Sequence, residues 1–151
     1  MGNDLNNKIG IITFHNSYNC GSMLQAFALQ QVVDRLTGKD SEIIDFSNEG
    51  QQKLYSVRQP NDSLKNVIKN IILAPWFKRI ARNYESYERF KKNNFRLSNF
   101  PIHKSADLSD ADYDIVVAGS DQIWNITIAD GDDAYFLPWV KNARKVAYAP
   151  S

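Results

Sequence analysis

The sequence predicts an α/β fold in which helices flank a parallel sheet, and three observations carry that prediction. Short apolar runs rich in β-branched residues, at 9–14 and 115–118, are typical of strands that are covered on both faces. A polar loop and a stretch with helical periodicity follow the first run, and another apolar run comes at 41–46. Strand, helix and strand in this order form a βαβ unit, whose two strands lie parallel in one sheet.

The first half of the chain supplies this unit. Residues 9–14 predict the first strand, and Ser22 starts a capping-box pattern, so we expect a helix to begin near Met23. Gly38 stands where a left-handed C-cap belongs, and 41–46 predicts the second strand. The predicted apolar stripe of the helix consists of Leu24, Ala28, Leu29, Val32, Val33 and Leu36.

The second half completes the sheet after a helical excursion. Residues 47–62 are polar, and helical periodicity then runs to a break near Pro75. A longer helix follows, and we expect its aromatic stripe to be part of the core. Residues 115–118 and 145–149 predict two further strands, so the fold class is a Rossmann-like parallel sheet with flanking helices. The stripe consists of Trp76, Phe77, Ile80, Tyr84, Tyr87 and Phe90.

Composition excludes several classes of protein. The chain has 151 residues, 43% of them hydrophobic, which suffices for one folded domain over 8–151. A single cysteine and two histidines exclude an internal disulfide and a structural zinc site. The longest apolar stretch, 71–77, is too short to cross a bilayer, and no secretory pattern opens the chain. Residues 1–7 are polar and without periodicity, so we expect a disordered segment or a cloning remnant.

Charge is segregated along the chain. Residues 53–104 carry 12 basic and 3 acidic groups. Residues 105–133 carry 8 acidic groups and no basic group. The basic helical region is most simply a solvated face, and the alternative is a surface for nucleic acid, lipid phosphate or an anionic polymer. We expect a cytoplasmic protein without a transmembrane segment or a nucleic-acid partner, either free or peripheral at the inner face of the membrane.

Polar loops follow the first strand and the run at 115–118. Ligands of open parallel sheets bind beyond the carboxyl ends of the strands, where helix N-termini offer free amides. The chain has no Walker-type or GxGxxG phosphate loop. In the second loop, Asp121 is our candidate catalytic base, because a carboxylate there can accept a proton from a sugar hydroxyl. The candidate substrate-binding residues are Asn16, Asn19, Gly21, Ser22, Gly119, Ser120, Gln122 and Trp124.

Other chemistry-bearing residues favour structural interpretations. Cys20 lies near a helix N-terminus, but no second histidine or carboxylate is placed in the sequence to orient His15 as its base. A cysteine-dependent hydrolase is therefore a distant alternative. The acidic turn 130–133 is more typical of an exposed turn than of a cation site, and His103 has no predicted role. We expect neither a metal nor a cofactor.

Taken together, the loops resemble the polysaccharide pyruvyl transferase family. Residues 19–29, NCGSMLQAFAL, are similar to the family's N-x-G-[AS]-x-L-Q-x-x-A-L signature after the first strand. The GSDQIWN run at 119–125, YFL at 135–137 and YAPS at 148–151 resemble the family's later blocks, in the same order. The resemblance covers about residues 8–151.

The resemblance implies a bacterial, two-domain enzyme similar to B-type glycosyltransferases. Such an enzyme transfers the enolpyruvyl group of phosphoenolpyruvate to a sugar of a cell-surface polysaccharide or its precursor, leaving a pyruvate ketal and phosphate. It implies that 8–151 is the N-terminal domain, that a C-terminal half is missing, and that the isolated chain has no turnover. The alternative from another class is a non-catalytic carbohydrate-binding or interaction domain with the same fold.

Overall fold

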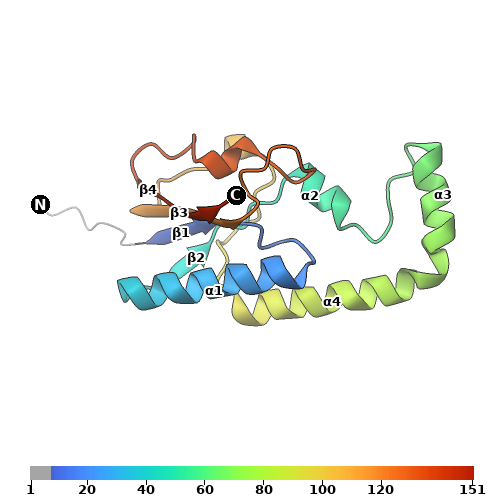
Figure 1. Ribbon diagram of the computed structural model, residues 1–151, viewed down its shortest axis with the longest axis horizontal. Coiled ribbons are helices and arrows are strands. Elements are labelled where there is room, and N and C mark those ends of the chain that lie inside the picture. Colours follow the sequence, from blue (N-terminus) through green and yellow to red (C-terminus); the bar gives the residue numbers. More distant parts are fainter. Residues whose placement is uncertain (1–7) are drawn as a thin grey trace, which may run out of the picture.

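The computed structural model describes residues 8–151, so the expectation for residues 1–7 lies outside the described part. Four strands form one parallel sheet in the order β2-β1-β3-β4. The strands are β1 (Ile9–Ile12), β2 (Ser41–Ile43), β3 (Ile115–Asp121) and β4 (Arg144–Pro150). The predicted α/β parallel-sheet class is confirmed, and Figure 1 shows the strands side by side above the long helices.

Both faces of β1, β2 and β3 are covered, as the continuous apolar runs predicted, whereas most residues of the edge strand β4 are exposed. Successive side chains of a strand point to opposite faces, so Val116 and Val117 enter two different cores. The core on one face includes Ile12, Phe14, Ile44, Phe46, Val116, Ala118 and Tyr135. The core on the other face, which packs on the first helix, includes Ile9, Ile11, Met23, Ala26, Leu29, Ile43, Phe95 and Val117.

Helix α1 (Cys20–Thr37) begins three residues earlier than the capping-box pattern predicted. Its N-cap is Asn19, whose side chain accepts a hydrogen bond from the Gly21 amide at 2.7 Å. The Ser22 hydroxyl is not a cap, because it donates to Asp121 across the crevice described below. The predicted C-cap is confirmed, since Gly38 adopts a left-handed conformation with φ of 66°.

The predicted apolar stripe of α1 was correct for Leu29 and Val33, which pack in the core under the helix, but wrong for its other members. Leu24, Val32 and Leu36 are exposed, and the buried residues of the helix are Met23, Ala26, Leu29 and Gln30. Gln30 supplies the reason, because its buried amide donates to the carbonyls of Ser41 and Arg96. Because Gln30 must face the main chain beneath the helix, the most apolar face of α1 is left partly exposed to solvent.

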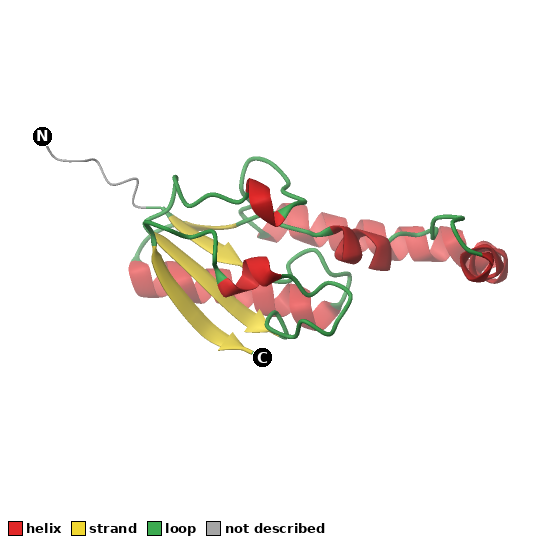
Figure 2. Cartoon of the chain, turned by 90° about the horizontal axis from the view of Figure 1, so that it is seen from above, coloured by secondary structure: helices red, strands yellow, loops and turns green. Residues whose placement is uncertain are grey.

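The excursion between β2 and β3 carries every α-helix of the described residues except α1. It contains α2 (Glu49–Leu54), α3 (Leu64–Leu73), the 3-10 turn η1 (Ala74–Trp76) and α4 (Phe77–Asn94). Figures 1 and 2 show α3 and the start of α4 extending well away from the sheet, while the end of α4 runs beside α1. No helix of the described residues is long and apolar enough to cross a membrane.

The expectation that the aromatic stripe of this region is core was wrong for most of its length. No residue of α3, η1 or α4 is buried. Only the end of α4 reaches the core, where Tyr87 and Phe90 pack partly buried against the residues under α1. The helical period is correct, but the sheet is too short to cover the whole excursion.

Asp110 fastens the loop before β4 to the segment before β3. One carboxylate oxygen accepts hydrogen bonds from the amides of Lys141, Asn142 and Ala143 at 2.7, 2.6 and 2.9 Å. The amides of Ala143 and Asn142 contribute most to lowering the pKa of Asp110 to about 2. Because the folded pKa is lower than the unfolded one, this contribution to stability is complete above about pH 4.

Asp110→Asn should lower the free energy of unfolding at pH 7 by about 1–2 kcal/mol, because hydrogen bonds to a charged acceptor are replaced by neutral ones. The difference from wild type should disappear as the pH falls from about 4 towards 2, where wild-type Asp110 also becomes neutral. Urea unfolding at pH 7 and at pH 2 measures both effects. Asp112→Asn, at an exposed position nearby, is the control, and an equal loss in both variants would contradict the prediction.

Candidate functional site

The candidate site is the region between the loops that follow β1 and β3, at the switch point of the strand order, and we call this region the crevice. The chain leaves β1 through α1 towards β2 on one side, and it leaves β3 towards β4 on the other. The loops after β1 and β3 therefore diverge at the carboxyl ends of adjacent strands, the place where parallel sheets bind ligands. Figure 2 shows loops gathered beyond the arrowheads of the strands.

One hydrogen bond joins the two predicted loops. The Ser22 hydroxyl, in the first turn of α1, donates to Oδ2 of Asp121 at 2.6 Å. The other carboxylate oxygen of Asp121 accepts from the Gln122 amide at 2.8 Å. Asp121 has a φ of 82°, a conformation that aspartate and asparagine tolerate better than most residues. The carboxylate is partly exposed and held from both sides.

The remaining predicted residues of the first loop do not converge on Asp121. Asn19 caps α1 through the amide of Gly21, and both residues are exposed at the helix N-terminus. Asn16 faces α4 instead, where its Oδ1 accepts from Lys91 Nζ at 2.7 Å. The sequence located the polar loop after β1, but it could not separate Ser22, which bonds to Asp121 of β3, from the residues that cap α1 or contact α4.

Two predicted residues of the second loop serve its backbone geometry. Ser120 is buried, and its carbonyl accepts from the Thr13 hydroxyl at 3.5 Å. Gly119 lies against β4, and a Cβ added there would stand 2.1 Å from the carbonyl oxygen of Tyr148. Gln122, in contrast, is exposed and available to a ligand.

Trp124 is part of an exposed aromatic pair. Its ring stacks on Phe136 with centroids 5.5 Å apart and an interplanar angle of 16°. The indole nitrogen donates to the Tyr135 carbonyl at 3.1 Å, which fixes the ring in place. Trp124 and Phe136 are 39% and 46% exposed. The pair offers a flat apolar surface next to the second loop, of the kind on which sugar rings stack.

Asp130 is a site candidate that the sequence analysis considered only as part of an acidic turn expected to be exposed. It is buried, and burial followed by the nearby negative charge of Asp121 raises its pKa. Burial, with the charge of Asp130 as a further cause, also raises the pKa of Tyr55. Long-range folding brings these groups together, so no local motif signals them.

The acidic turn that contains Asp130 has structural partners. Asp132 Oδ1 accepts from the Ala134 amide at 2.9 Å and so caps the 3-10 helix η3 (Asp133–Phe136). The main-chain oxygens of Asp130 and Gly131 accept from the Asn48 side chain. Within residues 8–151, no group of three potential metal ligands comes together.

His15 does have a carboxylate partner, contrary to the sequence analysis. Its buried ring places Nε2 at 2.9 Å from Asp45 Oδ1 and Nδ1 at 3.3 Å from the Thr13 carbonyl. Burial acts to raise the pKa of Asp45, but the hydrogen bond and charge of His15 outweigh it and lower the pKa. The pair lies thirty positions apart in the sequence, which is why spacing did not reveal it. Both ring nitrogens are thereby engaged within the fold.

Cys20 is exposed at the start of α1, and its Sγ lies 3.2 Å from the Tyr87 hydroxyl. Tyr87 belongs to a cluster of tyrosines around Tyr18, whose hydroxyl donates to Glu88 at 2.7 Å. The thiol thus faces a phenol on α4, and the one histidine of its loop is committed to Asp45. The surroundings do not provide a base for a thiolate nucleophile.

Cys20→Ser in the full-length protein should lower turnover less than tenfold, because the serine hydroxyl keeps a hydrogen bond to Tyr87 and no nucleophile is lost. Steady-state rates of purified wild type and variant measure this. A thousandfold loss with an unchanged circular dichroism spectrum would contradict the prediction and restore the nucleophile.

The fold defines a class, the parallel α/β domains, in which ligand sites typically lie at a switch point such as the one between β1 and β3. A family model described as polysaccharide pyruvyl transferase matches residues 19–151. The chain belongs to this family, as its loop motifs predicted. Comparison with curated proteins and with solved structures gave no match.

Proposed function

We propose that this chain forms the acceptor side of an enzyme that transfers a pyruvyl group from phosphoenolpyruvate to a saccharide. The observation that carries the proposal is the Ser22–Asp121 hydrogen bond, which sets a carboxylate at the crevice between β1 and β3. Membership in the polysaccharide pyruvyl transferase family supports the reaction class. We further propose that residues 8–151 act together with a C-terminal half.

The reaction has one acid step and two base steps. Two sugar hydroxyls each form a bond to C2 of the donor, the phosphate leaves, and the methylene carbon gains a proton to become methyl. One hydroxyl proton balances the new methyl group, and the other leaves with the phosphate. The enzyme therefore needs a base near the sugar and an acid near the enol carbon.

Asp121 and Asp130 match these two needs. Asp121 is partly exposed and hydrogen-bonded, so it suits a base that accepts a hydroxyl proton. Asp130 is buried with a raised pKa, so it retains a proton more readily and suits an acid. The charged Asp121 carboxylate repels an anionic donor and favours a neutral sugar, which assigns its part of the crevice to the acceptor, whereas Asp130 in its protonated form carries no charge that would repel the donor.

A second candidate function is carbohydrate binding without turnover. The stacked Trp124–Phe136 pair favours it, because an exposed aromatic surface binds sugar rings without any acid or base. The two functions differ in what they require, since binding alone does not depend on phosphoenolpyruvate.

The deciding experiment incubates the full-length protein with phosphoenolpyruvate and a panel of saccharides that carry paired hydroxyls. Release of inorganic phosphate that depends on a saccharide, together with the mass of the ketal product, supports the proposed transferase. Saccharide binding by calorimetry with no phosphate release supports the binding function. Phosphate release independent of saccharide, or neither binding nor release across the panel, would overturn the proposal.

A further inference from the structure

In the middle of the helical excursion, one segment packs on neither core of the described residues. We call residues 63–83, which comprise α3, η1 and the first part of α4, the arm. None of its side chains is buried. Figure 1 shows α3 standing at the far end of α4, away from the sheet. Packing in the domain core therefore does not explain the apolar residues of the arm.

One face of the arm is strongly apolar. Apolar side chains recur at spacings of three and four, as in an amphipathic helix, and they point outwards. Most of these side chains are at least half exposed. The surface of a monomeric protein seldom gathers so many exposed apolar side chains in one patch. The residues and their exposed fractions are Leu64 77%, Ile68 49%, Ile71 68%, Ile72 61% and Trp76 50%.

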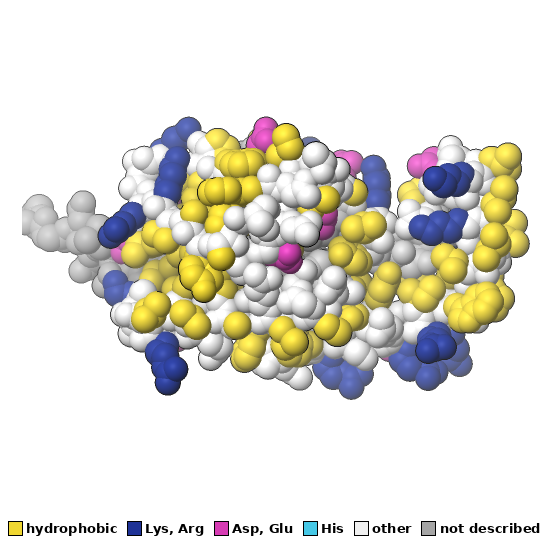
Figure 3. Space-filling view, viewed as in Figure 1, with side chains coloured by type: hydrophobic (Ala, Val, Ile, Leu, Met, Phe, Trp, Pro, Cys, Tyr) yellow, Lys and Arg dark blue, Asp and Glu magenta, His cyan; other side chains and the backbone are white. Residues whose placement is uncertain are grey.

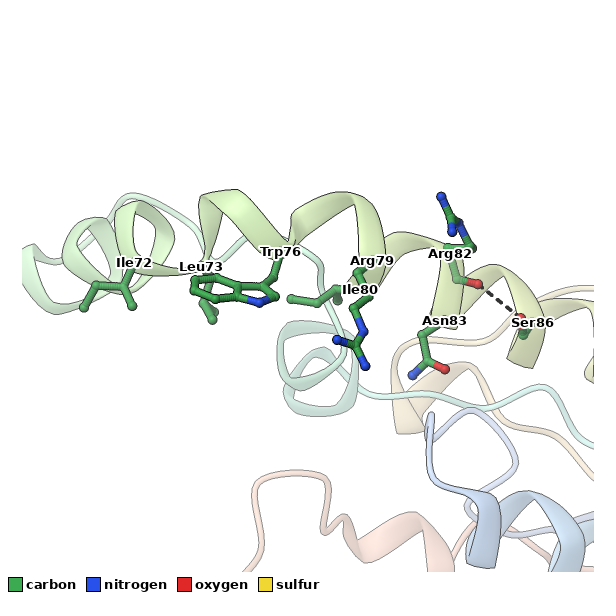
Figure 4. A pocket seen from close by; sticks show the side chains of 8 residues that line it. All are labelled: Ile72, Leu73, Trp76, Arg79, Ile80, Arg82, Asn83 and Ser86. Atoms are coloured by element: carbon green, nitrogen blue, oxygen red, sulfur yellow. Dashed lines mark hydrogen bonds between the residues drawn. The ribbon is translucent and has the colours of Figure 1, made fainter.

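The bend between α3 and α4 hollows this apolar face. A hollow of about 930 Å³ is lined mainly by apolar atoms of the arm and of the α4 turns that follow. In Figure 4, Ile72, Trp76 and Ile80 lie in a row along one side, while Arg79 and Arg82 extend in opposite directions. The apolar row thus has guanidinium groups at its margins.

The charge of the arm has a single sign. Residues 63–83 contain five basic side chains and no acidic one. Figure 3 shows apolar side chains along the outer edge of this end of the molecule, with Lys and Arg beside them. The basic residues are Lys65, Lys69, Lys78, Arg79 and Arg82.

An anionic lipid surface complements both properties at once. Helices that lie in a membrane interface combine a large apolar face, basic residues along its borders, and Trp near the headgroups. Phosphate groups of a nucleic acid would satisfy the cations but would leave the isoleucines in water. A neutral apolar protein surface would satisfy the isoleucines but not five uncompensated cations.

We propose that the arm docks on an anionic membrane surface, with Ile71, Ile72 and Trp76 at the boundary between headgroups and acyl chains. Lys78 and Arg79 then contact lipid phosphates. The inference is independent of the transferase reaction, because neither the crevice nor a substrate enters it.

The test is sedimentation of the full-length protein with vesicles. Vesicles of phosphatidylglycerol and phosphatidylcholine should bind it at least tenfold more tightly than vesicles of phosphatidylcholine alone, and added salt should weaken binding. Ile72→Glu/Trp76→Glu should reduce binding to the anionic vesicles at least tenfold. Lys78→Gln/Arg79→Gln should do the same while keeping the apolar face.

The matched control places two glutamates on α1. Val32 and Leu36 are 48% and 79% exposed, so Val32→Glu/Leu36→Glu makes the same chemical change at similar exposure and should leave vesicle binding within twofold of wild type. All positions are exposed, and circular dichroism checks that each variant is folded. Equal loss in both glutamate variants, equal affinity for neutral vesicles, or arm-dependent dimers with no vesicle binding would overturn the proposal.

Discussion

Asp121→Asn should reduce turnover of the full-length protein by roughly 10² to 10⁴, with little change in melting temperature. An amide cannot take the proton of a sugar hydroxyl at neutral pH, so the proposed base is lost. The fold should survive, because asparagine tolerates the φ of 82° at this position. Its amide can also keep the contacts with Ser22 and the Gln122 amide.

The measurement is the rate of phosphate release at saturating phosphoenolpyruvate, with thermal unfolding of the same samples. Asp133→Asn is the control, since Asp133 is an exposed carboxylate in the neighbouring η3 and should keep near-normal turnover. Asp121 is not the base if its variant retains wild-type turnover. The same holds if activity falls only as far as stability does.

Gly119→Ala should be the most destabilising single substitution of the sheet, by at least about 3 kcal/mol. The Gly119 φ of 151° lies in a region that L side chains rarely adopt, and the added Cβ would stand 2.1 Å from the Tyr148 carbonyl oxygen. Neither β3 nor β4 can move away without breaking the ladder that joins them. Chemical denaturation, or loss of folded protein on expression, measures the effect.

Gly38→Ala separates the effect of the positive φ from the effect of the close contact with Tyr148. Gly38 also has a positive φ, of 66°, but no atom lies within 4 Å of the position where a Cβ would stand. Its substitution should therefore cost only about 1 kcal/mol, the cost of left-handed backbone alone. Similar losses in the two variants would show that the close approach between β3 and β4 is not the cause.

The sheet could be predicted because its signal is local. Two-sided burial requires continuous apolar runs, and those at 9–14 and 115–118 became β1 and β3. The contact face of α1 could not be predicted, because Gln30 binds main chain from β2 and from the segment after α4. A hydrophobic stripe predicts where a helix lies in the sequence. The elements that pack against the helix determine which of its faces is buried.

The residues of the candidate site also divide into those that the sequence could predict and those that it could not. Asp121 ends β3, and Ser22 lies in the first turn of the helix that follows β1, so the order of strands and helices placed both residues at the same edge of the sheet. Asp130 and Asp45 reach their positions through long-range contacts, with Asp121 and His15 respectively. Contacts between side chains that are distant in the sequence depend on the path of the loops, so no local sequence pattern predicts them.

The helix that carries the arm also holds the first loop of the crevice, and this sets the reach of the molecule. The last turns of α4 grip that loop, since Lys91 Nζ donates to Asn16 and Glu88 accepts from the Tyr18 hydroxyl, both at 2.7 Å. An α-helix of 18 residues is about 27 Å long and curves only gently. Helix α4 therefore keeps the arm at a fixed distance from the first loop, so a membrane bound by the arm would also fix the orientation of the proposed acceptor site.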